Sequence, residues 1–194
     1  SHQNPPQAIT LFAAFRRIVS EKEVWKLACV YCMYGFSYII YLTFYVAYLV
    51  KEIGKSPSEA GSMFAIIGFI AIFAGLLWGA FSDKVGRRCA CICIYLVLAV
   101  AYALPAFFHE SFFLYLSAVM FGIAFSVPVL MAAAAGDAVG GQLAPAALGL
   151  ITLMFGIAQT IGPIIGGRIK DATGTFTYAF MLCTGFAVAG ALLS

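Results

Sequence analysis

The sequence predicts an all-α membrane protein with six transmembrane helices, and three observations support this. Hydrophobic residues make up 63% of the 194 residues, whereas only 10% are charged. A soluble domain carries about a quarter charged residues, so these charges are too few to cover a water-exposed surface. Apolar stretches of roughly 20 residues, the length that crosses a bilayer, recur along the chain. They do not alternate apolar and polar residues, as the strands of a membrane barrel would.

Six apolar segments long enough to span a membrane follow one another along the chain. They are residues 24–50, 58–81, 89–108, 111–135, 145–167 and 176–193. Ser20 and Glu23 predict a capping box at the start of the first span. Ser56 and Glu59 predict a second capping box, with Pro57 at the first helical position of the second span.

Residues 1–23 form a separate segment ahead of the six-helix domain, which we expect to cover residues 24–194. The apolar side chains in this segment fall on one helical face, whereas Arg16 and Arg17 lie off it. The residues on the apolar face are Ile9, Phe12, Phe15 and Val19. This pattern predicts a cytoplasmic linker with a short amphipathic helix on the membrane surface. A disordered linker is the alternative.

Basic residues are divided unevenly between the two ends of the predicted bundle. Seven of the eleven lie in the N-terminal segment, at the start of the first span and in the loop after the second span. They are Arg16, Arg17, Lys22, Lys26, Lys84, Arg87 and Arg88. The positive-inside rule makes their side cytoplasmic. Because six spans return the chain to the same side, we expect a multi-pass protein of the inner or plasma membrane with both ends of this segment cytoplasmic.

The loop after the second span carries the first functional pattern. It contains Gly79, Asp83, Lys84, Gly86, Arg87 and Arg88. This run resembles the G-x-x-x-D-[RK]-x-G-[RK]-[RK] signature of the major facilitator superfamily of transporters. Asp83 lies at a helix end, where it can pair with an arginine or with the N-terminus of another helix. Such a pair can form in one conformation and break in another, so we expect a gate. A loop that only fixes topology is the alternative.

The fifth span carries a second pattern, made of Gly162, Pro163, Gly166 and Gly167. Small residues let helices approach closely, and proline loosens the backbone ladder, so we expect these residues to act in conformational change. With the following Asp171-Ala-Thr-Gly sequence, the pattern resembles spans eleven and twelve of the superfamily. The fourth span lacks the arginine that an N-terminal half usually carries. The resemblance covers about residues 24–194 and implies spans seven to twelve of a prokaryotic-type permease, built as two three-helix repeats.

The resemblance implies a particular partner. The basic N-terminal stretch fits the linker between two halves, and the chain stops directly after its last span, so we expect a fragment that pairs with an N-terminal six-helix half. The implied function is secondary active transport of a small solute by alternating access. Two alternatives remain open: a six-span half-transporter that self-associates, and a membrane receptor or scaffold that keeps the fold without transport.

Six tyrosines of the first span recur at alternating spacings of three and four residues, which places them on one helical face. They are Tyr31, Tyr34, Tyr38, Tyr41, Tyr45 and Tyr48. Phenol hydroxyls facing lipid would lack partners, so this face should point inward. Because the first span resembles a cavity-lining helix of the superfamily, we expect Tyr34, Tyr38, Tyr41 and Tyr45 to line the substrate cavity. Packing against neighbouring helices is the alternative.

Three further polar residues are candidates. We assign Gln159 either to solute contact or to an interhelical hydrogen bond. Ser126, with Pro128, interrupts the fourth span, so it is both a cavity candidate and a bending point. Asp137, near the cytoplasmic end of the fourth span, is predicted to be a cap or gate residue.

Several classes of function find no support in the sequence. No ionisable residue lies in the middle of a span, so a proton-coupling group, if one is used, is expected in the other half. Otherwise the substrate or an exchange partner carries the coupling. The cysteines are interpreted as packing residues, without a metal or cofactor. No paired carboxylates, serine triad or phosphate loop indicates an enzyme. A net charge of +3 without a basic stripe argues against nucleic acid.

Overall fold

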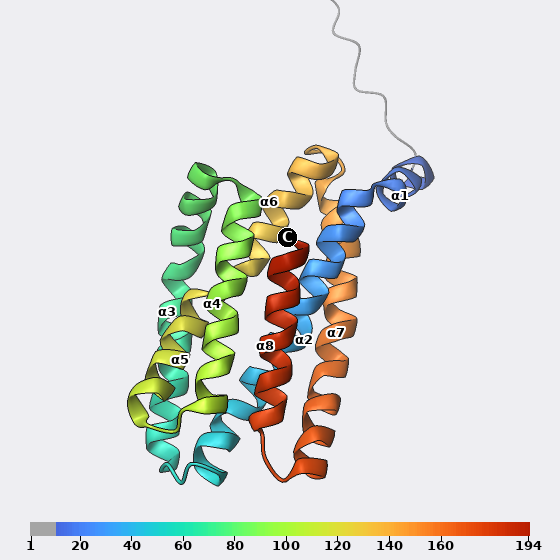
Figure 1. The fold of residues 1–194 in the computed structure, drawn as a ribbon. Coiled ribbons are helices and arrows are strands. Elements are labelled where there is room, and N and C mark those ends of the chain that lie inside the picture. Colours follow the sequence, from blue (N-terminus) through green and yellow to red (C-terminus); the bar gives the residue numbers. More distant parts are fainter. Residues whose placement is uncertain (1–10) are drawn as a thin grey trace, which may run out of the picture.

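The computed structural model describes residues 11–194, with side chains from Phe15 onward, and this part of the chain folds into eight helices (Figure 1). They are α1 (Leu11–Ser20), α2 (Lys22–Lys51), α3 (Pro57–Val85), α4 (Arg87–Phe107), α5 (Ser111–Ile123), α6 (Val127–Val139), α7 (Ala144–Thr173) and α8 (Thr177–Leu193). Because α5 and α6 follow each other within one apolar stretch, they form a single interrupted span. The prediction of an all-α protein with six apolar spans is confirmed.

The helices stand side by side, and their connections gather at two ends (Figure 1). The upper end in Figure 1 carries α1, the α3–α4 and α6–α7 connections and the end of α8. The lower end carries the α2–α3, α4–α5 and α7–α8 connections. The seven basic residues named above therefore lie at the upper end, and the other four, Lys51, Lys55, Arg168 and Lys170, lie toward the lower end. Which end faces the cytoplasm stays a prediction.

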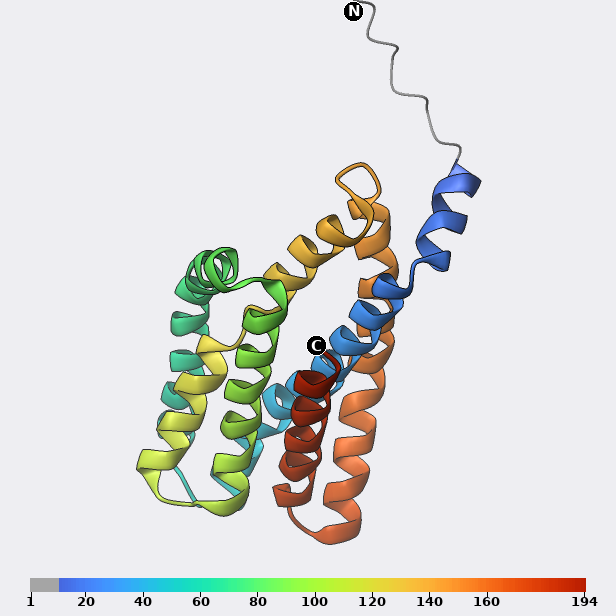
Figure 2. The same ribbon diagram turned by 45° about the horizontal axis from the view of Figure 1, so that its top comes forward.

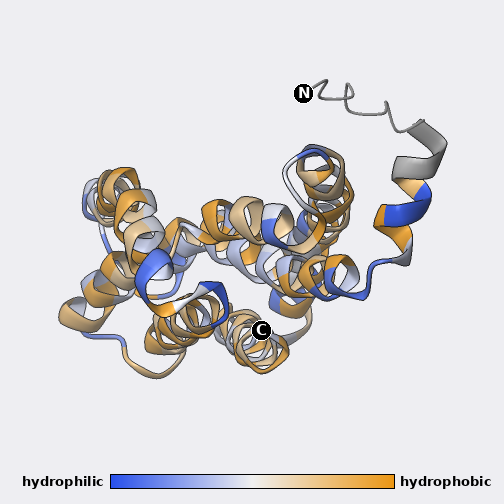
Figure 3. Ribbon diagram, turned by 90° about the horizontal axis from the view of Figure 1, so that it is seen from above, coloured by the Kyte–Doolittle hydropathy of each residue, from blue (hydrophilic) through white to orange (hydrophobic). Residues whose placement is uncertain are grey.

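Helix α2 occupies a central position in the bundle. It packs against α7 on one side and against α8 on another, while α4 packs between α8 and α5 (Figure 2). Hydrophobic residues colour the outside of the bundle on most sides when it is viewed from above (Figure 3). Leu76 is 78% exposed and Leu192 is 82% exposed, which is the surface expected of a protein whose solvent is lipid.

One predicted helix start is confirmed and one is wrong. Ser56 caps α3: its hydroxyl accepts a hydrogen bond of 3.2 Å from the backbone N–H of Glu59. The Glu59 carboxylate pairs with Lys55 at 2.7 Å. At the first span, Ser20 does not cap α2. It is the last residue of α1, and its hydroxyl donates to the Arg17 carbonyl, because the chain is already helical before this point.

The segment ahead of the first span contains a helix, as predicted. Ile9 lies outside the described residues, and so does the side chain of Phe12. Within the described part, Phe15 is 60% exposed, whereas Ile18, which is not on the predicted apolar face, is only 2% exposed. Helix α1 therefore turns Ile18 toward the bundle. A location of α1 on the membrane surface stays a prediction.

The glycines of α7 set how closely it approaches α2. A Cβ atom on Gly162 would lie 2.9 Å from the Phe36 carbonyl oxygen, and one on Gly166 would lie 2.7 Å from the Phe44 ring. At Gly162, where backbone stands in the way, only a residue without a side chain allows this contact, whereas at Gly166 the Phe44 ring would have to shift. The helix then continues through the Asp171-Ala-Thr sequence, which forms its last turn rather than a loop, and ends at Gly174 with φ +79°.

We expect Gly162→Ala to lower the free energy of unfolding by about 1–3 kcal/mol, because the added methyl group overpacks a contact with backbone. Gly156→Ala is the matched control on the same helix, since a Cβ there meets open space. It should leave stability unchanged or raise it slightly. The measurement is thermal unfolding of the full-length protein in detergent. Equal effects of the two substitutions would contradict this account of the α2–α7 contact.

Candidate functional site

Three tyrosine hydroxyls of α2 are bonded inside the bundle. The Tyr41 hydroxyl lies 2.6 Å from that of Ser117, which donates to the Ala101 carbonyl of α4 at 2.6 Å. Tyr45 donates to the Leu114 carbonyl of α5 at 2.7 Å, and Tyr48 donates to the Pro105 carbonyl of α4 at 2.6 Å. The Tyr48 contact uses a carbonyl close to the end of α4. These bonds fasten α2 to the neighbouring spans.

In this structure Tyr41 and Tyr45 pack in the interior of the bundle, which is the alternative to a cavity-lining position. Both are 0% exposed, and a side chain completely enclosed by its own chain has no surface to offer a solute. The alternating spacings of three and four residues correctly predict that the tyrosines share a face of α2 that points away from lipid. The inward side of this helix is the interior of the bundle, where carbonyls of α4 and α5 serve as acceptors.

Tyr34 is also enclosed, at 1% exposure, and its ring stacks on that of Tyr38 with centroids 4.8 Å apart. Its hydroxyl is buried and has no hydrogen-bond partner among the described residues, a property it shares with the hydroxyl of Tyr102 on α4. The prediction that Tyr34 lines the cavity meets the same objection, because its ring is covered by its own chain. Tyr38, at 9%, lies at the edge of the buried face.

Three aromatic rings from different elements meet around Tyr38 at mid-height in the bundle. The Tyr38 ring centroid lies 5.6 Å from that of Phe155 on α7 and 6.0 Å from that of Phe125 between α5 and α6. Phe125 and Phe155 are both half-buried, so their rings keep some exposed surface. We call Tyr38, Phe125 and Phe155 the aromatic patch. Nothing in the sequence distinguishes the two phenylalanines, because a phenylalanine in an apolar span resembles ordinary packing.

Gln159 and Ser126 flank the aromatic patch along the chain. Gln159 follows Phe155 by four residues, which places it on the same side of α7, and it is half-buried. Ser126 is the residue after Phe125, is 3% exposed and stands at the N-terminus of α6. Contact of either residue with a solute stays a prediction.

The fourth span is interrupted beside the aromatic patch, where the sequence predicts a bending point. Residues 124–126 are not helical, and Pro128 stands in the first turn of α6. The interruption leaves the Ile123 carbonyl available, and the indole N–H of Trp78 on α3 donates to it at 2.7 Å. In lipid such a freed carbonyl needs a partner from the protein, and Trp78 supplies it.

A cluster of charges joins three helices at the upper end. The Arg87 guanidinium lies 2.6 Å from the Asp83 carboxylate near the end of α3 and 3.4 Å from the Asp137 carboxylate in the last turn of α6. Arg87 also donates to the Ser82 hydroxyl. Asp83 and Asp137 are 65% and 66% exposed, so each ion pair contributes only about 0–1 kcal/mol. Contacts this weak can break during a conformational change.

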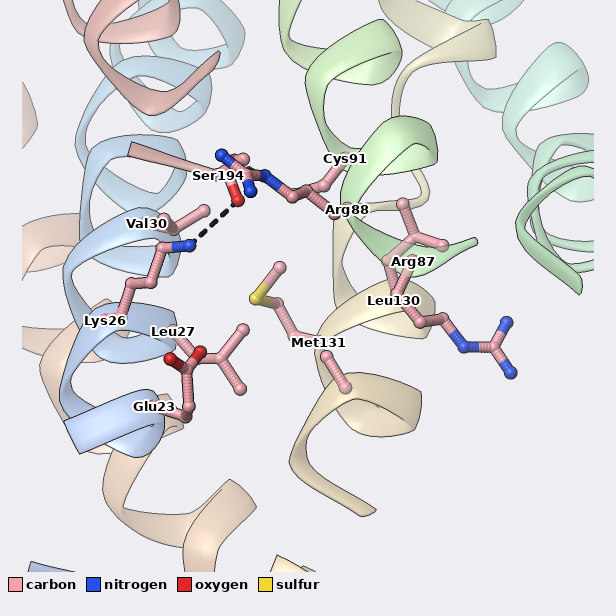
Figure 4. Close-up of a pocket in the computed structure, with 11 residues that line it drawn as sticks. Glu23, Lys26, Leu27, Val30, Arg87, Arg88, Cys91, Leu130, Met131 and Ser194 are labelled. Atoms are coloured by element: carbon pink, nitrogen blue, oxygen red, sulfur yellow. Dashed lines mark hydrogen bonds between the residues drawn. The ribbon is translucent and has the colours of Figure 1, made fainter. Parts of the chain in front are cut away.

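The other loop residues have separate positions. Gly86 has φ +89°, which lets the chain turn directly from α3 into α4, while Gly79 lies within α3, where a Cβ would meet open space, and Lys84 is exposed. Arg88 points away from the Arg87 cluster, toward α2 (Figure 4). Within the described residues, no group of three or more His, Cys, Asp or Glu side chains could hold a metal ion.

Comparison with known proteins agrees with this architecture. Residues 4–194 match the family described as "Uncharacterised MFS-type transporter YbfB". The chain belongs to the major facilitator superfamily. It is similar to the hexuronate transporter of Bacillus subtilis, with 29% identity over 197 residues that cover 90% of this chain and 44% of that protein. It is also similar to the D-arabinitol transporter of Klebsiella pneumoniae, with 28% identity that covers 91% of this chain and 44% of that protein.

Among solved structures, the superfamily transporter FucP in its outward conformation superposes with a TM-score of 0.81. The superposition covers 100% of this chain and 47% of FucP at 14% sequence identity, so it shows the fold alone. The chain thus spans a little less than half the length of the relatives that it matches.

We expect Tyr45→Phe to lower the free energy of unfolding by about 0.5–1.5 kcal/mol, because it removes a buried interhelical hydrogen bond. Tyr38→Phe, the matched control on the same helix, removes a hydroxyl that takes part in none of those bonds and should leave stability within experimental error. Thermal unfolding of the full-length protein compares the two. A larger loss for Tyr38→Phe would show that the interior contacts are assigned to the wrong tyrosines.

Proposed function

We propose that this chain is the C-terminal half of a twelve-span permease, which moves a small solute across the membrane by alternating access. The observation that carries the proposal is the position of Arg87, which holds the ends of α3, α4 and α6 together through Asp83 and Asp137. Three helix ends joined by weak, exposed ion pairs make a contact that can be exchanged when one half of a transporter rocks against the other. The coverage of less than half of each relative supports an N-terminal six-helix partner.

In this proposal the upper end faces the cytoplasm of a cell whose plasma membrane contains the permease. Seven of the eleven basic residues lie at that end, which is the distribution that the positive-inside rule associates with the cytoplasmic side. The gate formed by Asp83, Arg87 and Asp137 then controls access from the cytoplasm. The protein acts as a transporter rather than an enzyme.

The aromatic patch supports a wall of the solute pathway. Tyr38, Phe125 and Phe155 come from three elements that meet at mid-height, beside the interruption of the fourth span. Interrupted helices near the membrane midplane are where secondary transporters place their binding sites. Aromatic rings offer flat apolar surface, and the Tyr38 hydroxyl and the Gln159 amide offer hydrogen bonds. This combination suits a small hydroxylated solute with apolar ring or chain carbons.

Transporters of hexuronate and D-arabinitol are among the relatives, so sugar acids and polyols are the substrate class to examine first. The spans of this half carry no cation at mid-height. A carboxylate on the solute would therefore be bound by the N-terminal half, while this half contacts the hydroxylated carbon chain.

The test is uptake by the full-length protein in proteoliposomes, with labelled sugar acids, polyols and monocarboxylates offered one at a time. We expect time-dependent accumulation of at least one of them above empty liposomes. Binding of a solute without any flux would overturn the transport proposal and favour the receptor alternative. Monomeric native mass of an active twelve-span product would exclude a self-associating half.

We expect Asp83→Asn to reduce the uptake rate severalfold while the amount of folded protein is unchanged, because the amide keeps the shape but loses the charge that pairs with Arg87. Glu110→Gln is the control, since Glu110 is an exposed carboxylate at the opposite end. It should transport like the parent protein. Unaltered uptake by Asp83→Asn would remove Asp83 from the gate.

A further inference from the structure

A cavity of about 280 Å³ opens at the upper end, between α2, α4, α6 and the end of α8. It is separate from the aromatic patch, and Arg87 of the proposed gate is among the residues that line it. Its inner wall is apolar and includes Leu27, Val30 and Met131. Charged side chains of α2 and α4 surround the rest (Figure 4).

The positive charges at this cavity are not all neutralised. Arg87 points away from it and is paired with Asp83 and Asp137. Lys26 and Arg88 reach the same side of the cavity, near Ser194 (Figure 4). Within the described part of the chain, neither of them lies within 4.0 Å of an Asp or Glu carboxylate oxygen.

Lys26 donates one hydrogen bond, of 3.0 Å, to the Ser194 carbonyl, which leaves two of its three donors for another group. Arg88 adds a planar fork of donors suited to two oxygens of one phosphate. Among the described side chains that line the cavity, Glu23 carries the one carboxylate, so Lys26 and Arg88 leave an excess of positive charge.

Two helix N-termini add to this charge. Helix α2 begins at Lys22 and α4 begins at Arg87, and no side chain of the described residues caps either of them. The first backbone N–H groups of a helix carry a partial positive charge and favour an anion nearby. The cavity therefore combines two side-chain cations, uncapped helix starts and an apolar inner wall.

The level at which the cavity lies in the membrane indicates the source of a bound anion. Trp25, next to Lys26 in the chain, is 39% exposed, and its indole N–H donates to the Val19 carbonyl at 2.8 Å. An outward tryptophan beside basic residues is typical of the level of lipid headgroups. Basic pockets between membrane helices at that level bind phospholipid headgroups.

We propose that this cavity binds a phosphate group through Lys26 and Arg88, supplied by the headgroup of an anionic phospholipid or by a free phosphate. The bound group bridges α2 to α4 directly beside Arg87. It thereby stabilises the arrangement in which Arg87 pairs with Asp83 and Asp137. This site is independent of the solute pathway.

The test measures binding to the full-length permease in detergent, by native mass spectrometry and thermal shift. The probes are short-chain phosphatidylglycerol, short-chain phosphatidylcholine and inorganic phosphate. We expect the double variant Lys26→Gln, Arg88→Gln to bind phosphatidylglycerol about tenfold or more weakly than the parent. Lys22→Gln is the matched control, because it removes the same charge one turn earlier on α2 at an exposed position outside the cavity. It should bind within twofold of the parent.

Arg88→Lys keeps the charge and should retain most of the binding, which separates loss of the site from loss of folding. If inorganic phosphate stabilises the parent but not the double variant, free phosphate is a source of the bound group. If only the lipid binds, the source is the phospholipid headgroup. Equal binding by the double variant, or an equal loss in Lys22→Gln, overturns the proposal. None of these binding measurements depends on transport. A failure of the phosphate-site proposal can therefore be distinguished from a failure of the transport proposal.

Discussion

The fold depends on one constraint, that polar groups within a membrane-spanning bundle must find partners in the protein itself. Helix α2 carries a row of phenol hydroxyls, and those of Tyr41, Tyr45 and Tyr48 find partners on α4 and α5, whereas that of Tyr34 has none among the described residues. The tyrosine face is thereby fixed toward the bundle interior. The rotation of α2 about its axis follows from these bonds, and so does the choice of which residues remain available to a solute.

The opposite side of α2 is fixed by contact rather than by hydrogen bonds. Gly162 and Gly166 of α7 bring that helix against Phe36 and Phe44, with no room for a Cβ atom. One face of α2 is bonded to α4 and α5, and another contacts the glycines of α7. Some surface of α2 between these two faces stays exposed, and Tyr38 lies at its edge. The aromatic patch forms there because Phe155 and the interruption at Phe125 reach the same height. A bundle held on both sides of α2 is suited to move as a rigid body.

Charges are confined to the two ends, where they have distinct partners. Arg87 and Arg88 are neighbours in the chain, yet successive residues at a helix start point in different directions. One joins α3, α4 and α6 through Asp83 and Asp137, and the other turns to the cavity beside Lys26. The start of a single helix can therefore serve a gate and a binding site for a phosphate group at once.

The sequence by itself determined the class of protein, the six spans, the position of the break in the fourth span and the motifs that identify the superfamily. These follow from the length and composition of apolar stretches and from local chemistry, such as Ser56 capping α3. It also showed that the tyrosines share one inward face. Only the tertiary structure decided what that face meets. A hydroxyl is satisfied equally well by a solute or by a carbonyl of a neighbouring helix, so periodicity cannot distinguish a cavity wall from the bundle interior. Periodicity also cannot show that Phe125 and Phe155 lie beside Tyr38, because the three residues come from separate elements that meet only in the folded structure.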